Sequence, residues 1–140
     1  MLHLLDASVL ITAQNSYYAI DAVPEFWAWL VNRAEAGYIK IPREIYDEIK
    51  DGGTDKEKDL LYEWIQQPAV KAALILKEDV DPVLVQTVIE QGYAGDLDDV
   101  EIEKLGRDPF LIAYGLAAAD RSVVTAEVSE PKKQRANRKI

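Results

Sequence analysis

The first eleven residues constrain the fold of this chain more than any other stretch. Residues 2–5 are a largely apolar run of the kind found in a buried strand, and an acidic residue, Asp6, follows directly. A second apolar run then begins, with Ser8 near its head. Ligands of open α/β sheets bind outside the carboxyl ends of the strands, so we expect Asp6 to lie in an active site. We expect Ser8 to cap the helix that follows, because its hydroxyl can accept a hydrogen bond from a free helical N–H group.

The composition of the chain favours a single soluble domain. A chain of 140 residues can bury roughly two thirds of its unfolded surface without covalent staples. The sequence contains no cysteine, so it offers neither a disulfide nor a thiolate metal site. The amino terminus has no basic segment followed by an apolar one, and no apolar run approaches the length of about eighteen residues that a membrane span needs. We therefore expect a cytoplasmic protein with no membrane partner.

The charge of the chain is unevenly distributed. A net charge of −9 argues against a surface that grips nucleic acid broadly, because such binding relies on Lys and Arg to neutralise phosphates. Five basic residues nevertheless crowd the last nine positions, namely Lys132, Lys133, Arg135, Arg138 and Lys139. A basic tail of this kind could bring RNA phosphates toward a carboxylate site whose metal ions reverse the local charge. A solvated tail without a role is the alternative.

The remaining sequence alternates between strand-like and helix-like segments and has no internal repeat. Further strands are expected at residues 38–41 and 122–125, and residues 70–76 fit either a strand or a short helix. Residues 15–16 are expected to begin a loop. Helices are expected at residues 8–15, 24–36, 43–50, 55–66 and 82–89, with a short one ending near residue 105. This alternation predicts an α/β fold with a mostly parallel central sheet.

The helix expected at residues 24–36 is apolar on more than one side. Phe26, Trp27 and Leu30 belong to a stripe at three- and four-residue spacing, which should face the core. Trp29 lies off this stripe. Core packing alone is the simpler interpretation, and a partner on the second face is the alternative.

Three acidic residues beyond Asp6 are candidates for chemistry. Glu44 and Glu48 lie four residues apart on one helix, and like charges at this spacing cost a few tenths of a kcal/mol. A bound cation would relieve this repulsion, although solvation would also make it tolerable. Asp108 opens a helix of small and apolar residues that leads directly into the strand at 122–125, and Ala113 and Ala117 should allow that helix to approach the sheet closely.

Other acidic residues are better explained as helix caps. Asp81-Pro82 is a plain helix start, with Asp81 as N-cap and Pro82 at the first position. Asp96, Asp98 and Asp99 do not have the spacing of a calcium-binding loop, so we expect them to be capping and solvent-facing.

The residue types present limit the catalytic mechanisms that the chain could use. The chain has no cysteine, and its one histidine, His3, falls within the first strand, where a structural role is expected. Ser-His-Asp, Cys-His and histidine-ligated zinc mechanisms therefore lack essential parts. Carboxylates alone suit hard cations such as Mg²⁺ or Mn²⁺, which prefer oxygen ligands and retain several waters.

The order of these motifs resembles that of PIN domains, the nuclease fold of VapC-type toxins. Three segments carry the resemblance: Asp6-Ala7-Ser8-Val9-Leu10-Ile11, then Glu48-Ile49 six residues after Pro42, then the helix from Asp108 before the strand that ends at Thr125. Glu44 is the other candidate for the second acid. The fourth acid is Glu127, where the family usually has Asp.

The resemblance spans residues 2–127. It implies a PIN-like domain over residues 1–130, with a three-layer α/β/α architecture around a central, mostly parallel sheet, and a basic tail at residues 131–140. PIN sheets usually finish with one more strand, so either the fold is slightly truncated or residues 138–140 begin that strand.

The resemblance also implies a function. Asp6, Glu48 and Asp108 would hold one or two Mg²⁺ or Mn²⁺ ions, Glu127 would position water or a second ion, and Ser8 and Thr125 would orient the ligands. The activity would be metal-dependent endoribonuclease activity, as in the toxin of a toxin–antitoxin pair. RNA would be the substrate, a cognate antitoxin would be the protein partner, and a homodimer could use the helix at 24–36.

Two other classes of protein fit the same sequence. One is a PIN-like module that binds RNA or protein without catalysis, which the unusual Glu127 would suit. The other is an unrelated α/β domain whose acidic residues are helix caps and solvated faces.

Overall fold

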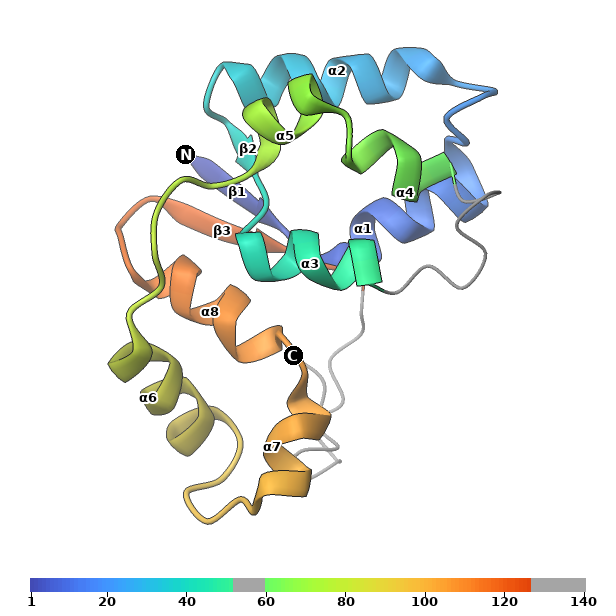
Figure 1. Ribbon diagram of the computed structural model, residues 1–140. Coiled ribbons are helices and arrows are strands. Elements are labelled where there is room, and N and C mark those ends of the chain that lie inside the picture. Colours follow the sequence, from blue (N-terminus) through green and yellow to red (C-terminus); the bar gives the residue numbers. More distant parts are fainter. Residues whose placement is uncertain (52–59, 127–140) are drawn as a thin grey trace.

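The computed structural model describes residues 1–51 and 60–126, and it confirms the α/β class. Its three strands are β1 (Leu2–Leu5), β2 (Ile39–Lys40) and β3 (Arg121–Val124). They form a parallel sheet in the order β2-β1-β3, with His3 opposite Ile39 and Leu5 opposite Val124 (Figure 1). The first strand of the chain is therefore the central strand of the sheet.

The helices surround this sheet. Figure 1 shows α2 and α5 on one side of it and α8 on the other. In the described residues the helices are α1 (Ala7–Thr12), the π-helix η1 (Ala13–Tyr17), α2 (Pro24–Glu35), α3 (Arg43–Asp51), α4 (Leu60–Ile65), α5 (Pro68–Leu74), α6 (Pro82–Gly92), α7 (Asp99–Leu105) and α8 (Asp108–Leu116). Proline stands in the first turn of α2, α5, α6 and α8, where its missing N–H group costs no hydrogen bond. None of the described helices is long and apolar enough to cross a membrane.

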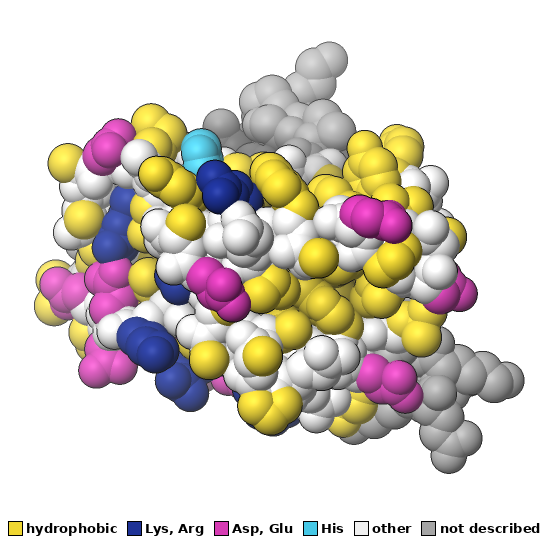
Figure 2. Space-filling model, turned by 90° about the horizontal axis from the view of Figure 1, so that it is seen from above, with side chains coloured by type: hydrophobic (Ala, Val, Ile, Leu, Met, Phe, Trp, Pro, Cys, Tyr) yellow, Lys and Arg dark blue, Asp and Glu magenta, His cyan; other side chains and the backbone are white. Residues whose placement is uncertain are grey.

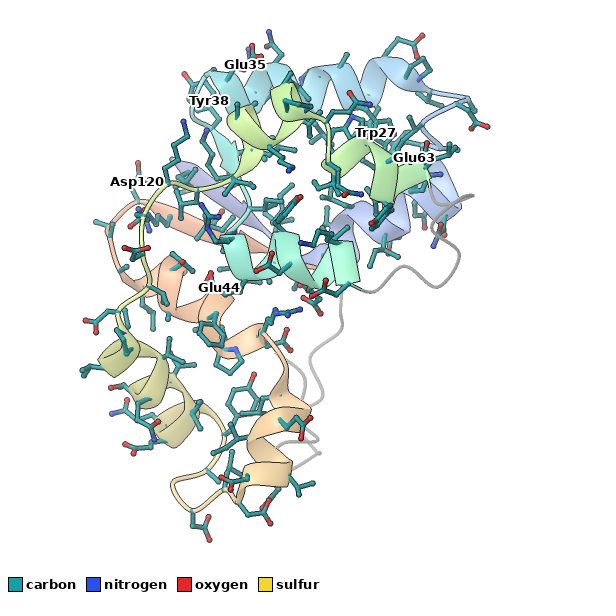
Figure 3. The ribbon with its side chains drawn as sticks, viewed as in Figure 1. Trp27, Glu35, Tyr38, Glu44, Glu63 and Asp120 are labelled. Atoms are coloured by element: carbon teal, nitrogen blue, oxygen red, sulfur yellow. The ribbon has the colours of Figure 1, made fainter. Side chains whose placement is uncertain are left out.

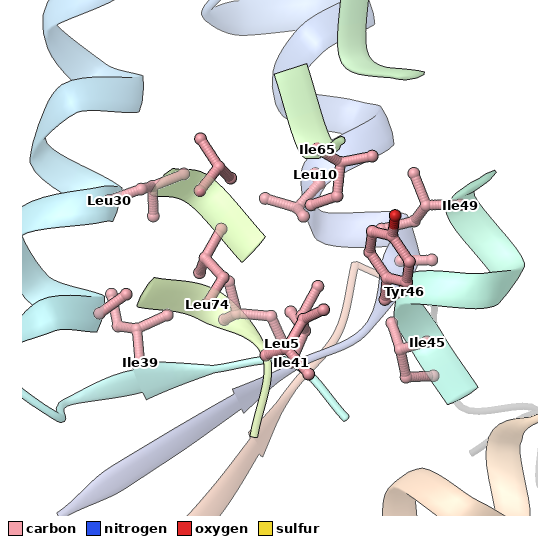
Figure 4. Close-up of a cluster of buried hydrophobic side chains, with 14 of the residues drawn as sticks. Leu5, Leu10, Leu30, Ile39, Ile41, Ile45, Tyr46, Ile49, Ile65 and Leu74 are labelled. Carbon is pink, nitrogen blue, oxygen red and sulfur yellow. The ribbon is translucent and has the colours of Figure 1, made fainter. Parts of the chain in front are cut away.

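The main core lies between the sheet and the helices α1 to α5. Ile41, Ile45 and Ile49 are all buried, as their four-residue spacing predicts. They pack with Leu5 of β1 and Leu74 of α5, among others (Figure 4). Leu4 and Leu5 of β1 are buried in this core, which explains why the second half of the strand is apolar.

A second, smaller core holds α6 and α7 against α8. Its buried members are Val85, Val88, Ile89, Leu105 and Ala113. Helix α8 borders both cores, because Ala113 faces the second one while Leu111 and Tyr114 belong to the first.

The approach of α8 to the sheet depends on Gly115. A Cβ atom at this position would come within 3.0 Å of Cγ2 of Val123 in β3. The expectation that Ala113 and Ala117 allow this approach is wrong, because Ala113 is buried in the second core and Ala117 is exposed. The reason is that α8 ends at Leu116, and Ala117 follows it at the surface.

The segment after α1 also differs from expectation. Residues 13–17 form a π-helical turn instead of opening a loop at residues 15–16. The N–H group of Tyr18 bonds the carbonyl oxygen of Ala13 at 2.7 Å, and the indole of Trp27 donates to the carbonyl oxygen of Tyr18. These bonds fix a wide turn that carries Tyr17 and Tyr18 at the surface.

The structure resolves the one segment whose type the sequence left open. Most of the segment at 70–76 is helical, within α5, because Pro68 starts the helix and the alanines that follow favour it. The short β-bridge between Ile41 and Ile75 follows where α5 ends. The first part of the helix expected at 55–66 lies outside the described residues, and α4 begins at Leu60.

Helix α2 has two apolar faces, as the sequence predicts. Trp27 and Leu30 are buried, while the side chain of Trp29 is 52% exposed. A groove of about 520 Å³ runs between α2, α4 and α5, lined in part by Trp27, Val31 and Trp64. The view onto this face shows apolar side chains spread over its middle with acidic side chains among them (Figure 2).

Candidate active site at the carboxyl end of the sheet

Asp6 lies at the point where the strand order of the sheet reverses. The chain passes from the central strand β1 to β2 on one side and then to β3 on the other. The carboxyl ends of β1 and β3 are therefore neighbours at a topological switch point, which is where open α/β sheets bind their ligands. Asp6 follows β1 there, and its backbone N–H group bonds the carbonyl oxygen of Val124 at the end of β3, at 2.9 Å. Its side chain is buried, with 4% exposure, and it is the one buried charged residue of the described chain.

Two hydroxyl groups hold the carboxylate of Asp6. Ser8 Oγ and Thr125 Oγ1 each donate to Oδ2 of Asp6 at 2.9 Å, and the two hydroxyl oxygens lie 3.3 Å apart. The backbone N–H group of Ala126 in turn donates to Ser8 Oγ at 3.1 Å. This network fixes the orientation of one carboxylate oxygen and ties the ends of β1 and β3 together.

The expectation that Ser8 caps α1 is wrong. Asp6 occupies the N-cap position of this helix, and its side chain makes no capping bond. Ser8 lies inside the first turn, so its hydroxyl is free to turn toward Asp6 and the chain after β3. The sequence alone could not show this, because the partners Thr125 and Ala126 are more than a hundred residues away.

Helix α3 carries Glu48 alongside α8. The hydroxyl of Tyr114 in α8 donates to Glu44 at 2.9 Å, and Arg107 lies 3.6 Å from Asp51. The two helices therefore run antiparallel, with the end of α3 beside the start of α8. Glu48 is half-buried between these two contacts, and its Oε2 atom is shielded from solvent.

Glu44 belongs to a different network from Glu48. Tyr114, which bonds Glu44, also contacts the carbonyl oxygen of Glu78, and Arg121 both bonds the carbonyl oxygen of Tyr114 and pairs with the carboxylate of Glu78. Burial, the hydrogen bond to Glu44 and nearby acids hold the pKa of Tyr114 well above its usual value. Arg121 begins β3, so this network lies toward the amino end of that strand. Figure 3 labels Glu44, the member of the network on α3, and Asp120, which precedes β3.

This placement separates the two candidates for the second acid. Thr125 follows the other end of β3, about 13 Å from Arg121 along an extended strand. Glu48 is one helical turn, about 6 Å, farther along α3 than Glu44, in the direction of the contact between Asp51 and Arg107. Along α3, Glu48 therefore lies nearer than Glu44 to the end of the sheet that carries Asp6.

Asp108 is half-buried in the first turn of α8. It differs from the aspartates that only cap helices, because the N-cap position of α8 is Arg107. Asp81 and Asp98, in contrast, accept backbone N–H bonds as N-caps of α6 and α7 and are exposed, as expected.

The three predicted ligands thus lie on adjoining elements. Helix α3 packs against α1, which starts after Asp6, and against α8, which starts with Asp108. Across residues 1–51 and 60–126, however, no three His, Cys, Asp or Glu side chains are grouped tightly enough to hold a metal ion. Glu127 lies outside the described residues.

His3 has a structural partner, as expected from its place in β1. Its Nδ1 atom lies 2.7 Å from Ser122 Oγ on the neighbouring strand. This pair bridges β1 and β3 inside the sheet, away from the carboxyl ends of the strands.

A comparison with models of protein families assigns the chain to one family. The model of one family, described as a domain of unknown function (DUF4411), matches residues 3–140. The chain belongs to the DUF4411 family. The match includes every candidate acid, from Asp6 to Glu127, so the proposed site lies within the DUF4411 domain. No curated protein is significantly similar to the chain.

The donor atoms at the switch point of this DUF4411 domain suit a hard cation. Around Asp6 they are carboxylate and hydroxyl oxygens, and no cysteine occurs in the sequence. Mg²⁺ commonly uses only one or two carboxylates and completes its shell with water and substrate phosphates. The chemistry of these donor atoms therefore fits such an ion.

Proposed function

We propose that this DUF4411 protein is a PIN-like, Mg²⁺- or Mn²⁺-dependent endoribonuclease that acts as the toxin of a toxin–antitoxin pair. The observation that carries the proposal is the buried carboxylate of Asp6 at the switch point, oriented by the hydroxyls of Ser8 and Thr125. Burial of a charged group costs free energy of folding. The stability of the fold alone therefore does not explain a buried carboxylate at this position.

The residues of the site have distinct roles in this proposal. Asp6, Glu48 and Asp108 bind the metal, and Glu127 positions water or a second ion. A bound Mg²⁺ or Mn²⁺ supplies a water of lowered pKa and stabilises charge on the leaving oxygen of the phosphodiester. Ser8 and Thr125 keep the carboxylate of Asp6 in one orientation, and Asp6 would hold the ion with its side chain fixed in this way.

The biological assignment follows from the resemblance to VapC-type toxins. In such a pair, a cognate antitoxin occupies the toxin and silences it. Helix α2, with its exposed Trp29 and adjoining groove, is our candidate for a contact between two copies of the chain.

The test is cleavage of labelled RNA by metal-stripped protein, with Mg²⁺ or Mn²⁺ restored or withheld. We expect cleavage only with metal, and a loss of at least about 100-fold in Asp6→Asn, Glu48→Gln and Asp108→Asn, because each removes a charged ligand. Asp81→Asn and Glu44→Gln are the matched controls and should retain activity, since both residues lie outside the proposed ligand set. Equal activity in Asp6→Asn and wild type would refute the proposal.

A binding module without catalysis is the second candidate. The observation that favours it is the lack of a close group of three acids in the described residues. Calorimetric titration with Mn²⁺ separates the candidates: metal binding that Asp6→Asn abolishes, with several unrelated RNAs left intact, indicates the binding module. If no metal binds and Asp6→Asn is as stable as wild type or more so, the acids are structural and both functions fail.

A further inference from the structure

Arg107 stands at a position that disfavours arginine in two ways. It occupies the N-cap of α8 and makes no capping hydrogen bond with its side chain, whereas Asp81 and Asp98 accept backbone N–H bonds at the N-caps of α6 and α7. N-cap positions favour short polar side chains that accept such bonds. A cation at the amino end of a helix is also repelled by the positive end of the helix dipole. The stability of α8 therefore does not explain why arginine stands here.

The ion pair that Arg107 forms with Asp51 is weak. The nitrogen–oxygen distance is 3.6 Å, which is too long for a hydrogen bond, and the two side chains are 35% and 60% exposed. Exposed pairs of this kind contribute little to stability, because water competes for both charges. Arg121, in contrast, is 12% exposed and donates to both the carbonyl oxygen of Tyr114 and the carboxylate of Glu78. The guanidinium of Arg107 can therefore leave its partner at a small cost, which does not hold for Arg121.

The chain holds Arg107 beside the proposed metal ligands. Gly106 comes before it with φ 62° and ψ −130°, a conformation that residues with a side chain rarely adopt, and Asp108 follows it directly. Its partner Asp51 is the last residue of α3, the helix that carries Glu48. Arg107 therefore lies at the junction of the two helices that carry Glu48 and Asp108.

An arginine in this setting suits a phosphate group. The planar guanidinium can donate two parallel hydrogen bonds to a phosphate, and such bonds between charged groups are stronger than those between neutral groups. The chain has a net charge of −9, and proteins bind nucleic acid chiefly through cations that neutralise its phosphates. A releasable arginine beside the carboxylates supplies one such cation where the substrate must lie.

We propose that Arg107 binds a phosphate of the RNA strand next to the phosphodiester at the candidate site, and that Asp51 holds the guanidinium until RNA replaces it. This inference rests on the proposed function, which names RNA as the substrate. The contact is made to the backbone, so it does not depend on base sequence. Arg107 contributes to substrate binding and takes no part in the chemical step.

The test measures RNA binding by fluorescence anisotropy, with full-length protein in the Asp6→Asn background and labelled oligouridine as the probe. Arg107→Gln should weaken binding about 10- to 100-fold, and the slope of log affinity against log salt should become shallower by about 0.7, the value for one phosphate contact on a single strand. Arg107→Lys keeps the charge, so it should keep the slope and lose only part of the affinity. Arg43→Gln removes the same charge from the exposed start of α3, about 12 Å from Asp51 along the helix, and should leave affinity and slope unchanged.

The variant Asp51→Asn separates RNA binding from a purely structural role of the ion pair. If Asp51 competes with RNA for Arg107, Asp51→Asn tightens binding by up to about 5-fold, and the gain disappears when Arg107→Gln is added. If the pair only holds α3 against α8, Asp51→Asn weakens binding as Arg107→Gln does, and the inference is overturned. A gain that persists without Arg107 would be a general effect of charge and would also overturn it. Arg107→Gln should be as stable as wild type in urea unfolding, since Arg107 provides no cap for α8.

The outcomes distinguish this inference from the nuclease proposal. In the cleavage reaction, we expect Arg107→Gln to raise KM and to leave kcat nearly unchanged, because it removes binding that substrate and transition state share. RNA binding that depends on Arg107, without cleavage by wild type, would support the inference and refute the nuclease. Cleavage that requires Asp6, with the same KM and affinity in Arg107→Gln as in wild type, would do the reverse. The inference is also overturned if the full-length protein binds no RNA.

Discussion

At the scale of single residues, the hydroxyl groups on Asp6 do two things at once. Ser8 and Thr125 satisfy a buried carboxylate, and they also join the ends of two strands that are far apart in sequence. Hydrogen bonds to charged groups contribute more to stability than neutral ones. The same contacts that orient Asp6 for a ligand are therefore part of what holds the sheet together.

Thr125→Val tests this contribution, because it removes the hydroxyl and keeps the shape of the side chain. We expect the free energy of unfolding in urea to fall by about 1–3 kcal/mol, because the buried carboxylate loses one of its two hydroxyl donors while Ser8 remains. Thr87→Val is the control, since Thr87 bonds only a helical carbonyl on the exposed side of α6. Similar losses of unfolding free energy in the two variants would show that the bond to Asp6 stabilises the fold no more than the bond of Thr87 does.

Tyr114 gives the protein a predictable response to alkaline pH. Its folded pKa is raised above the ordinary value near 10, first by burial and then by Glu44. Above about pH 10 the unfolded chain releases the phenolic proton of Tyr114 while the folded chain retains it. The free energy of unfolding therefore falls as the pH rises. Urea unfolding between pH 8 and 11 should show a steeper decline for wild type than for Tyr114→Phe. Parallel curves for the two proteins would contradict this assignment.

At the scale of elements, the sequence predicts the strands and helices that depend on neighbouring residues alone. The strand before Asp6, the helices that start at Pro24 and Pro82 and the buried stripe of α3 follow from the local sequence, and the structure has them where expected. The contacts that join elements could not be predicted in the same way. Tyr114 and Glu44 are 70 residues apart, and nothing in either local pattern indicates the other. The sequence therefore indicated Asp6, Glu48 and Asp108 as candidates, with Glu44 as the alternative to Glu48, and the structure adds that Glu44 bonds Tyr114.

Gly115→Ala tests the packing of α8 on β3. Alanine favours a helix by up to about 1 kcal/mol over glycine, but its Cβ would lie 3.0 Å from Cγ2 of Val123, a branched side chain with little rotamer freedom. We expect a net loss of about 1 kcal/mol in urea unfolding, because overpacking outweighs propensity. Val123→Ala should reverse the sign of the Gly115→Ala effect in a double-mutant cycle. Gly92→Ala, which meets no atom within 4 Å, should not destabilise the protein.

At the scale of the whole molecule, the two cores divide the domain unequally. The main core contains the sheet and α1 to α5, whereas α6 and α7 rest on the far side of α8 through a few apolar residues. Figure 1 shows these two helices extending away from the sheet. Regions with less buried apolar surface open at lower free energy than the core.

Native-state hydrogen exchange should detect this division. We expect amides of α6 and α7 to exchange through a partial opening, while those of β1 and α3 exchange only through global unfolding. Val88→Ala, in the smaller core, should speed exchange in α6 and α7 and leave β1 unchanged, because the cavity weakens only the smaller unit. Uniform acceleration across the chain would show that the domain opens as one unit.

The pairing of β1 with β3 has one more consequence, for how errors in folding would appear. Leu5 lies opposite Val124, Asp6 bonds the same residue, and Thr125 follows it immediately. Side chains of a strand alternate between its two faces, so a slip of one residue would send Asp6 and Thr125 to opposite sides of the sheet. A molecule that mispairs these strands cannot bring Asp6 and Thr125 together. Correct pairing of β1 with β3 and formation of the candidate site therefore occur together.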